Sequence, residues 1–162
     1  MTLTMTSRAF EDGGIVPPRY SCFGDNVRPE FQIANPPPGT LSYALILHDI
    51  DVALGGSAED GLHWLAWNIP AHVGGIAEDE LPEGAVVGRN VEGRNAYLGP
   101  GAPPGPRYHH YVFELYALDA KLKLEPSAGR AKLLAAMDGT VVGKAAYVGR
   151  FRRSPDMVHK KD

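Results

Sequence analysis

The chain has 162 residues, of which 44% are hydrophobic and 22% charged, and its formal net charge is −3 at pH 7. The acidic balance argues against a dedicated nucleic-acid binder, which needs a strong basic excess to attract phosphates. The length allows one sizeable core and requires no second domain. We therefore expect a single domain over residues 1–162, with a core from about residue 7 to 151 and a solvated basic tail at residues 152–162.

The N-terminal segment carries neither the basic region nor the long apolar region of a secretory signal peptide. The longest apolar run, Tyr43 to Leu47, is far too short to span a bilayer. Cys22 is the only cysteine, so an intrachain disulfide is not possible and a reducing compartment is favoured. We expect a cytoplasmic protein without a transmembrane segment, in which Cys22 is structural rather than nucleophilic.

Short strand candidates, separated by turn residues, follow one another along the chain, which is typical of an all-β domain. They are rich in branched and aromatic residues, and they are Glu30 to Ala34, Ser42 to Asp49, His63 to Ile69, Tyr111 to Leu118 and Gly143 to Phe151. In the second and the fourth, both alternating faces are mostly apolar, which is expected when another layer covers each side of a strand. The pattern predicts a mainly β protein with a sandwich architecture.

One short peripheral helix is predicted at Gly129 to Met137, because Leu133 and Met137 would form part of an apolar stripe. The segments Asp51 to Gly61 and Gly74 to Asn95 are expected to be long loops, since apolar strands resume after both. We expect these loops to border a pocket.

A glycine- and proline-rich loop, Gly99 to Pro106, delivers His109 to the start of an apolar strand. Proline fixes φ and glycine permits conformations closed to other residues, so this loop specifies a rigid shape. Upstream, Asp49 and Asp51 end an apolar run and His63 opens another strand. These titratable groups are candidates for one pocket, with the loop from Gly101 onward as its wall.

Several of these residues have structural alternatives. Capping of the following loop is an equal alternative for Asp51. From its own pattern, His63 would be a core histidine, because the alternate residues of its strand up to Ile69 are apolar. Trp64 and Trp67 are expected to pack in the core rather than to form an aromatic box. Three further histidines lack a comparable context and are expected to be exposed or structural: His72, His110 and His159.

The motifs of other enzyme classes are missing from the sequence. By type, the histidines and aspartates are metal ligands, but no HExxH or paired-cysteine spacing is present, so a metal is the minor alternative. Neither a G-x-S-x-G elbow nor a P-loop occurs, which excludes the usual α/β-hydrolase and P-loop nucleotidase signatures.

Three motifs occur in a specific order. A D-x-D strand end at Asp49 is followed by H-W-x-x-x-N-I-P from His63, and then by a glycine- and proline-rich loop running into H-x-Y-V-F-x-L-Y-A-L-D from His109. This order resembles the phosphatidylethanolamine-binding proteins, in particular their bacterial, Raf kinase inhibitor-like (YbhB/YbcL-type) branch. Matching positions extend from Ala9 to about Val148, which is nearly the whole chain.

The resemblance implies a β-sandwich of antiparallel sheets with one or two short peripheral helices, and an anion pocket that needs no metal or cofactor. It places Asp49, His63, His109 and Tyr111 in that pocket, with Asp51 as an organiser of the loops. The full set of ligand-binding residues that we expect is Asp49, Asp51, His63, Ala102, Pro103, His109 and Tyr111.

The chain departs from the family pattern near this pocket. Where members usually have D-P-D-A-P, residues 49–53 read D-I-D-V-A, so the loop should be less constrained. His48 precedes the first acid, and Ala102 replaces a frequent glycine. His110 stands where an arginine is common, so we expect the D-x-D acids to lose a guanidinium partner.

The leading hypothesis is a module that binds a small anion, a phosphate or carboxylate head group that includes one derived from a phospholipid. The affinity of this module for the anion should rise in mild acid, because the histidines are then protonated. A second hypothesis is acid–base catalysis on a small molecule, of lyase, isomerase or hydrolase type, by His63, His109 and Asp49. A third, by analogy with eukaryotic relatives, is regulation of a kinase pathway through protein binding. Bacterial relatives commonly pair, so we also expect a homodimer.

Overall fold

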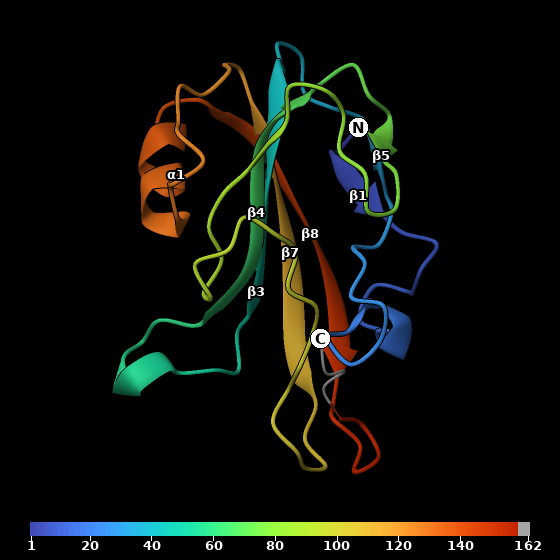
Figure 1. The fold of residues 1–162 in the computed structure, drawn as a ribbon. Coiled ribbons are helices and arrows are strands. Elements are labelled where there is room, and N and C mark those ends of the chain that lie inside the picture. Colours follow the sequence, from blue (N-terminus) through green and yellow to red (C-terminus); the bar gives the residue numbers. More distant parts are fainter. Residues whose placement is uncertain (159–162) are drawn as a thin grey trace.

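The computed structural model describes residues 1–158, and its strands form two antiparallel sheets (Figure 1). The larger sheet contains, in spatial order, β6 (Val86–Val87), β4 (Gly61–Pro70), β3 (Ser42–Asp49), β7 (His109–Leu118) and β8 (Val141–Phe151). The smaller sheet contains β1 (Thr4–Thr6), β2 (Phe31–Ala34) and β5 (Gly75–Ile76). The α-helix is α1 (Arg130–Met137), and short 3-10 helices lie at Pro18–Tyr20 and Leu54–Gly56. The mainly β fold is confirmed.

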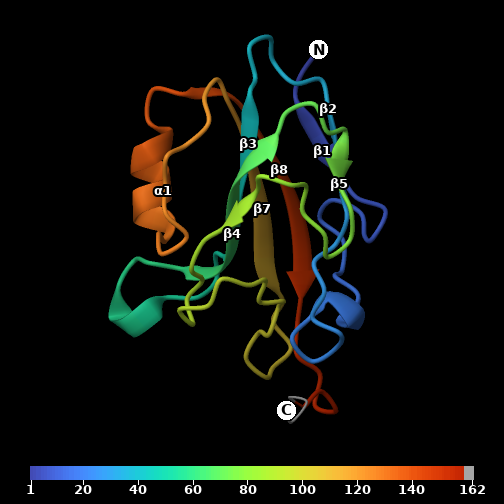
Figure 2. The same cartoon turned by 45° about the horizontal axis from the view of Figure 1, so that its top comes forward.

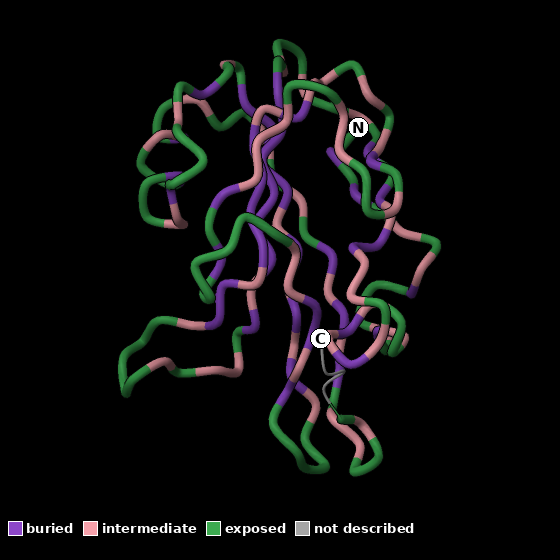
Figure 3. Tube along the Cα trace, in the orientation of Figure 1, coloured by how far each residue is buried: buried purple, intermediate pink, exposed green. Residues whose placement is uncertain are grey.

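Three layers are stacked, with the small sheet on one face of the large sheet and α1 on the other (Figures 1 and 2). In β3, Leu45 and Leu47 belong to the core between the sheets, while Ala44 and Ile46 belong to the core under α1. This confirms the two apolar faces that the sequence predicts, because successive side chains of a strand point to opposite faces. Buried residues accordingly follow one another along the middle of the large sheet (Figure 3).

The predicted strands and helix agree with the observed ones to within two residues at either end. The sequence does not predict β1, β5 or β6, of which β5 and β6 lie in the segment expected to be a long loop. Strands of two or three residues carry too short an alternation to be recognised. Leu3 and Met5 are buried around β1, so the packed core begins before residue 7.

An extra residue interrupts β4 at His63. Opposite β3, Leu47 pairs with Trp64 while His48 pairs with Leu62, so two residues of β3 face three of β4. Such a bulge bends the strand and re-aims a side chain. Leu62 packs under α1, whereas Trp64 and the ring of His63 lie on the side of the small sheet.

A second irregularity lies at Asn68, whose φ is 56°. Its side-chain amide donates to the carbonyl of Leu122 at 2.9 Å and accepts from the N–H of Leu122 at 2.8 Å. As a result Trp67 packs under α1 and Ile69 packs between the sheets. The alternate residues from His63 to Ile69 therefore do not all lie on one face of the strand, contrary to the sequence pattern. Core packing of Trp64 and Trp67 is confirmed.

Part of the expected solvated tail packs on the domain. Arg153 forms a backbone bridge with Pro104, and its guanidinium lies 4.9 Å from the centroid of the Phe23 ring. Residues 159–162, which include His159, lie outside the described residues. Within residues 1–158, no helix has the length and apolarity needed to cross a membrane.

Candidate functional site

His63 is held in one orientation by the loop that precedes β7. Its Nδ1 atom lies 2.7 Å from the carbonyl oxygen of Leu98, and because a carbonyl only accepts, Nδ1 carries the proton. Burial lowers the pKa of His63, and this effect outweighs the opposite effects of Leu98 and of the nearby Asp49. The Nε2 atom therefore presents a lone pair when the ring is neutral and an N–H when the ring is protonated.

His109 is oriented by the carboxylate at the end of β3. Its Nδ1 lies 2.7 Å from Oδ2 of Asp49, and Asp49 Oδ1 accepts the backbone N–H of Asp51 at 2.9 Å. Asp49 is only 1% exposed, and both of its oxygens have protein partners. In this arrangement Asp49 positions His109, whose Nε2 has no role in that hydrogen bond.

Tyr111 and Gly61 lie beside His63. The Tyr111 ring lies 5.3 Å from the His63 ring at an interplanar angle of 80°, and its hydroxyl accepts the N–H of Gly101 at 3.3 Å. Burial raises the pKa of Tyr111, and the negative charge of Asp49 adds to that rise, so the hydroxyl stays protonated. A Cβ added at Gly61 would lie 3.6 Å from Cβ of Asp49 and 3.8 Å from Nε2 of His63. Gly61 thus leaves open space between these two side chains.

An open pocket of about 280 Å³ lies against His63. Its lining residues are Cys22, His63, Glu92, Leu98, Gly99 and Gly101. Cys22 lies within the wall, where burial raises the pKa of its thiol. A raised pKa lowers the thiolate fraction, which agrees with a structural role for Cys22.

The part of the glycine–proline loop that lines the His63 pocket begins earlier in the chain than the sequence predicts. Gly101 lines the pocket as predicted, together with Leu98 and Gly99. Ala102 is 2% exposed and Pro103 is exposed, and neither lines this pocket. Of the other expected ligand-binding residues, His63 lines it, whereas its lining does not include Asp49, Asp51, His109 or Tyr111.

Asp51 holds the surrounding loops. Its Oδ2 accepts the backbone N–H of His110 at 2.7 Å and lies 2.8 Å from the ring Nδ1 of His110, while its Oδ1 accepts from Arg107 at 2.7 Å. Burial alone would raise the pKa of Asp51, but the hydrogen bonds of His110 and the charge of Arg107 lower it overall. The expected loss of a guanidinium partner is wrong, because Arg107 supplies one, and His110 has a structural role.

Within residues 1–158, no three His, Cys, Asp or Glu side chains are grouped so that they could hold a metal ion. The histidines use their Nδ1 atoms on Leu98 and Asp49, so each retains one ring nitrogen for another partner. The site is therefore suited to hydrogen bonding and proton transfer.

Comparison with known proteins identifies the family. The family model described as phosphatidylethanolamine-binding protein matches residues 6–152. The chain belongs to this family. A UPF0098 protein of Methanothermobacter thermautotrophicus is 38% identical over 156 residues, which cover 93% of this chain and 99% of that protein.

Two solved structures of family members have the same fold. E. coli YbcL, described as a member of the mammalian PEBP family, has a TM-score of 0.86 at 28% identity and covers 94% of this chain and 99% of its own. CT736 of Chlamydia trachomatis, described as a PEBP homologue, has a TM-score of 0.85 at 32% identity. The match covers 94% of this chain and 98% of CT736. The resemblance that the motifs indicate is thereby confirmed.

Three contributors to the site are not predicted by the sequence. Leu98 contributes a backbone carbonyl, which gives no sequence signal because every residue has one. Gly61 contributes open space, because it has no side chain. Arg107 was detectable, because it is the only cation between the proline-rich loop and His109.

Proposed function

We propose that this member of the phosphatidylethanolamine-binding protein family binds a small oxyanion, a phosphate or carboxylate head group, in the pocket at His63. The observation that carries the proposal is the fixed orientation of both histidines. Leu98 and Asp49 occupy the Nδ1 atoms of His63 and His109, so each ring keeps its Nε2 atom for a ligand, and His63 itself lines the pocket. An imidazolium N–H gives a charge-assisted hydrogen bond to an oxyanion.

Ionisation of His63 should control the affinity. Because burial lowers its pKa, His63 is neutral at neutral pH and offers a lone pair, which repels an oxyanion. Protonation replaces that repulsion by donation from Nε2. Affinity should therefore rise as the pH falls below the ordinary histidine range.

The test is calorimetric titration of sulfate, whose charge does not change between about pH 5 and 8, the range in which histidine titrates. We expect wild-type affinity to rise toward pH 5 and the variant His63→Ala to lose at least about tenfold there. His72→Ala, at an exposed position, is the matched control and should behave like wild type. Affinity that is independent of pH, or unchanged in His63→Ala, would contradict the proposal. Phosphoethanolamine and acetate at one pH then rank the head groups.

A second candidate is acid–base catalysis, which is favoured by the pairing of His109 with Asp49. A carboxylate that accepts from Nδ1 leaves Nε2 as a base and stabilises the imidazolium that forms. Hydrolysis of p-nitrophenyl acetate by wild type, with loss in His109→Ala, would support this candidate.

The homodimer and the cytoplasmic location remain part of the proposal, on the basis of the bacterial branch and of the single cysteine. Sedimentation velocity at high concentration tests the first, and fractionation of cells tests the second. Regulation of a kinase pathway rests on the resemblance alone.

A further inference from the structure

A second pocket is lined by the later part of the glycine–proline loop, whose earlier part lines the pocket at His63. Its volume is about 410 Å³, and its lining residues are Pro104, Gly105, Pro106, Arg152, Arg153, Ser154 and Pro155. The two walls project from the same end of the large sheet (Figures 1 and 2), and a backbone bridge between Pro104 and Arg153 ties them together. Proline has a fixed φ, so the walls lose little freedom when a ligand binds.

Arg152 and Arg153, which follow β8, line one side of this pocket, and together with Arg150 at the end of β8 they stack on aromatic rings. The guanidinium carbons of Arg150 and Arg152 lie 5.3 and 5.0 Å from the centroid of the Tyr108 ring. That of Arg153 lies 4.9 Å from the centroid of the Phe23 ring. Nε of Arg150 donates to the carbonyl of Gly13 at 2.8 Å, and Nε of Arg153 donates to that of Met157 at 3.3 Å. Stacking fixes each guanidinium plane and leaves the remaining N–H groups at its edge for an acceptor.

These three arginines differ from most others in their charge environment. Within residues 1–158, none of the three has a carboxylate oxygen within ion-pair distance, and the carboxylate of Asp156 accepts from the hydroxyl of Ser154 instead. By contrast, five other arginines each lie within 4.0 Å of a carboxylate oxygen, namely Arg8, Arg19, Arg94, Arg107 and Arg130. In a chain with a net charge of −3, this end of the molecule is therefore a local site of unneutralised positive charge.

We infer that this second pocket binds an amphiphilic organic anion, with its oxyanion head on the guanidinium groups of Arg152 and Arg153 and its apolar body against the prolines. Guanidinium groups match the geometry of a carboxylate or phosphate, and proline rings offer apolar contact. The inference goes beyond the proposed function and does not depend on His63.

The test uses decanoate as the probe and acetate as its short counterpart, in calorimetric titrations below the concentration at which decanoate aggregates. We expect decanoate to bind at least about tenfold more tightly than acetate, because each methylene that leaves water contributes to affinity. The double variant Arg152→Gln/Arg153→Gln should lose at least about tenfold in decanoate affinity. The control Lys121→Gln/Lys132→Gln removes the same charge from exposed positions and should keep wild-type affinity.

Further variants separate this pocket from the one at His63. His63→Ala should leave decanoate binding unchanged, whereas Pro155→Asp, which adds a negative charge to an exposed part of the wall, should weaken it. Thermal melting of each variant shows whether it is folded. If the double arginine variant does not fold, Pro155→Asp tests the pocket in its place. Decanoate affinity that survives loss of the arginines, that falls equally in the lysine control, or that is lost in His63→Ala would overturn the inference.

Discussion

At the scale of single residues, the wall of the His63 pocket approaches its neighbours so closely that one methyl group matters. A Cβ added at Gly101 would lie 2.6 Å from Sγ of Cys22, which is well inside contact distance. We expect Gly101→Ala to lower the free energy of unfolding by about 1–3 kcal/mol through overpacking. Removal of the sulfur in Cys22→Ala/Gly101→Ala should recover most of that loss.

Urea unfolding of the two single variants and the double variant measures this coupling as a double-mutant cycle. Gly74→Ala is the matched control, because an added Cβ at Gly74 meets nothing within 4 Å. Strictly additive losses at Cys22 and Gly101 would show that the two residues do not touch.

Gly61 lies in the opposite situation, because its surroundings accept a methyl group. An added Cβ would make ordinary contacts of 3.6 Å to Asp49 and 3.8 Å to His63. We expect Gly61→Ala to keep wild-type stability within about 1 kcal/mol. It should nevertheless bind sulfate several-fold more weakly, because the methyl group fills the space beside Nε2 of His63. Calorimetry and melting of the same sample distinguish the two effects, and full sulfate affinity would exclude Gly61 from the site.

At the scale of elements, the irregularities of β4 place its side chains. The irregularity at Asn68 is maintained by the left-handed backbone of this residue, φ 56°, and by its two side-chain hydrogen bonds to Leu122. Glycine tolerates that backbone but cannot make the bonds, and alanine satisfies neither requirement. We expect Asn68→Gly to cost about 1–3 kcal/mol for the lost hydrogen bonds and Asn68→Ala about 1 kcal/mol more for backbone strain. Urea denaturation gives both values, and an alanine variant as stable as the glycine variant would contradict the role of the backbone.

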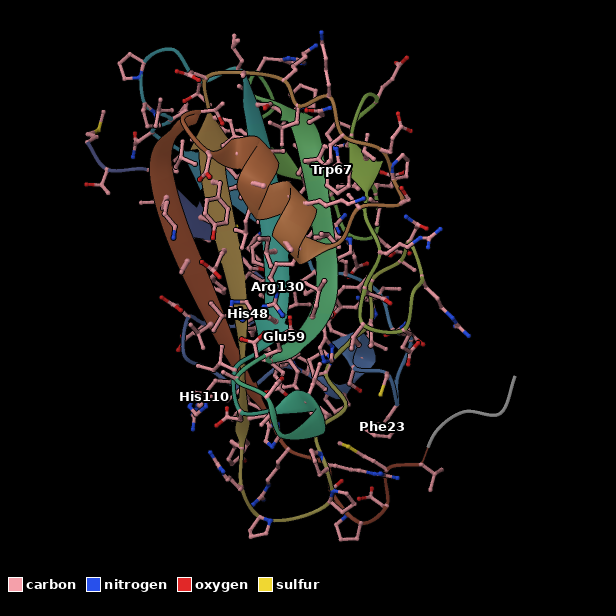
Figure 4. All side chains as sticks on the ribbon, turned by 90° about the vertical axis from the view of Figure 1, so that its left-hand side faces the viewer. Phe23, His48, Glu59, Trp67, His110 and Arg130 are labelled. Carbon is pink, nitrogen blue, oxygen red and sulfur yellow. The ribbon has the colours of Figure 1, made fainter. Side chains whose placement is uncertain are left out.

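At the scale of the whole molecule, a charged network joins α1 to the outer face of the large sheet. Nδ1 of His48 lies 2.7 Å from Asp60, and its Nε2 lies 2.6 Å from Glu114. Arg130 of α1 donates to the other oxygen of Asp60, and Lys144 of β8 lies 3.7 Å from Glu114. Figure 4 shows His48 and Arg130 close to one another at the end of the helix. The network connects β3, β7, β8, α1 and the segment before β4.

The two carboxylates around His48 set the pH range in which this network is stabilising. Burial alone would lower the pKa of His48, but the hydrogen bonds to Glu114 and Asp60 outweigh burial and raise it above 6.5. A raised pKa stabilises the folded state below the ordinary value and ceases to do so as the pH rises through the folded value. The hydrogen bond from His48 lowers the pKa of Glu114 from 4.5 to about 2, so its contribution is lost as the pH falls through that range.

We therefore expect the stability difference between wild type and His48→Gln to be largest between pH 4.5 and 6.5, the ordinary values for the two groups. Its magnitude there should be about 2 kcal/mol, as for hydrogen bonds between charged groups. Urea unfolding at a series of pH values measures it, with His72→Gln as the exposed control. A difference that does not change with pH would mean that His48 contributes only by packing.

The sequence by itself determined that the large sheet is covered on both faces, and it determined which motifs carry the candidate site residues. The doubly apolar patterns of Ser42 to Leu47 and Tyr111 to Leu118 require a strand with a layer on both faces, because alternation is a local property of the backbone. The ordered motifs at Asp49, His63 and His109 indicated the family, and the structure brings these residues together with Tyr111.

Only the tertiary structure decided how those groups point. The bulge at His63 depends on the register with β3, and the proton on its Nδ1 depends on a carbonyl 35 residues further along the chain. The partner of Asp51 likewise comes from Arg107, 56 residues away. Register and long-range hydrogen bonds are set by how the strands pack against each other, and the residue pattern of a single segment contains no information about them.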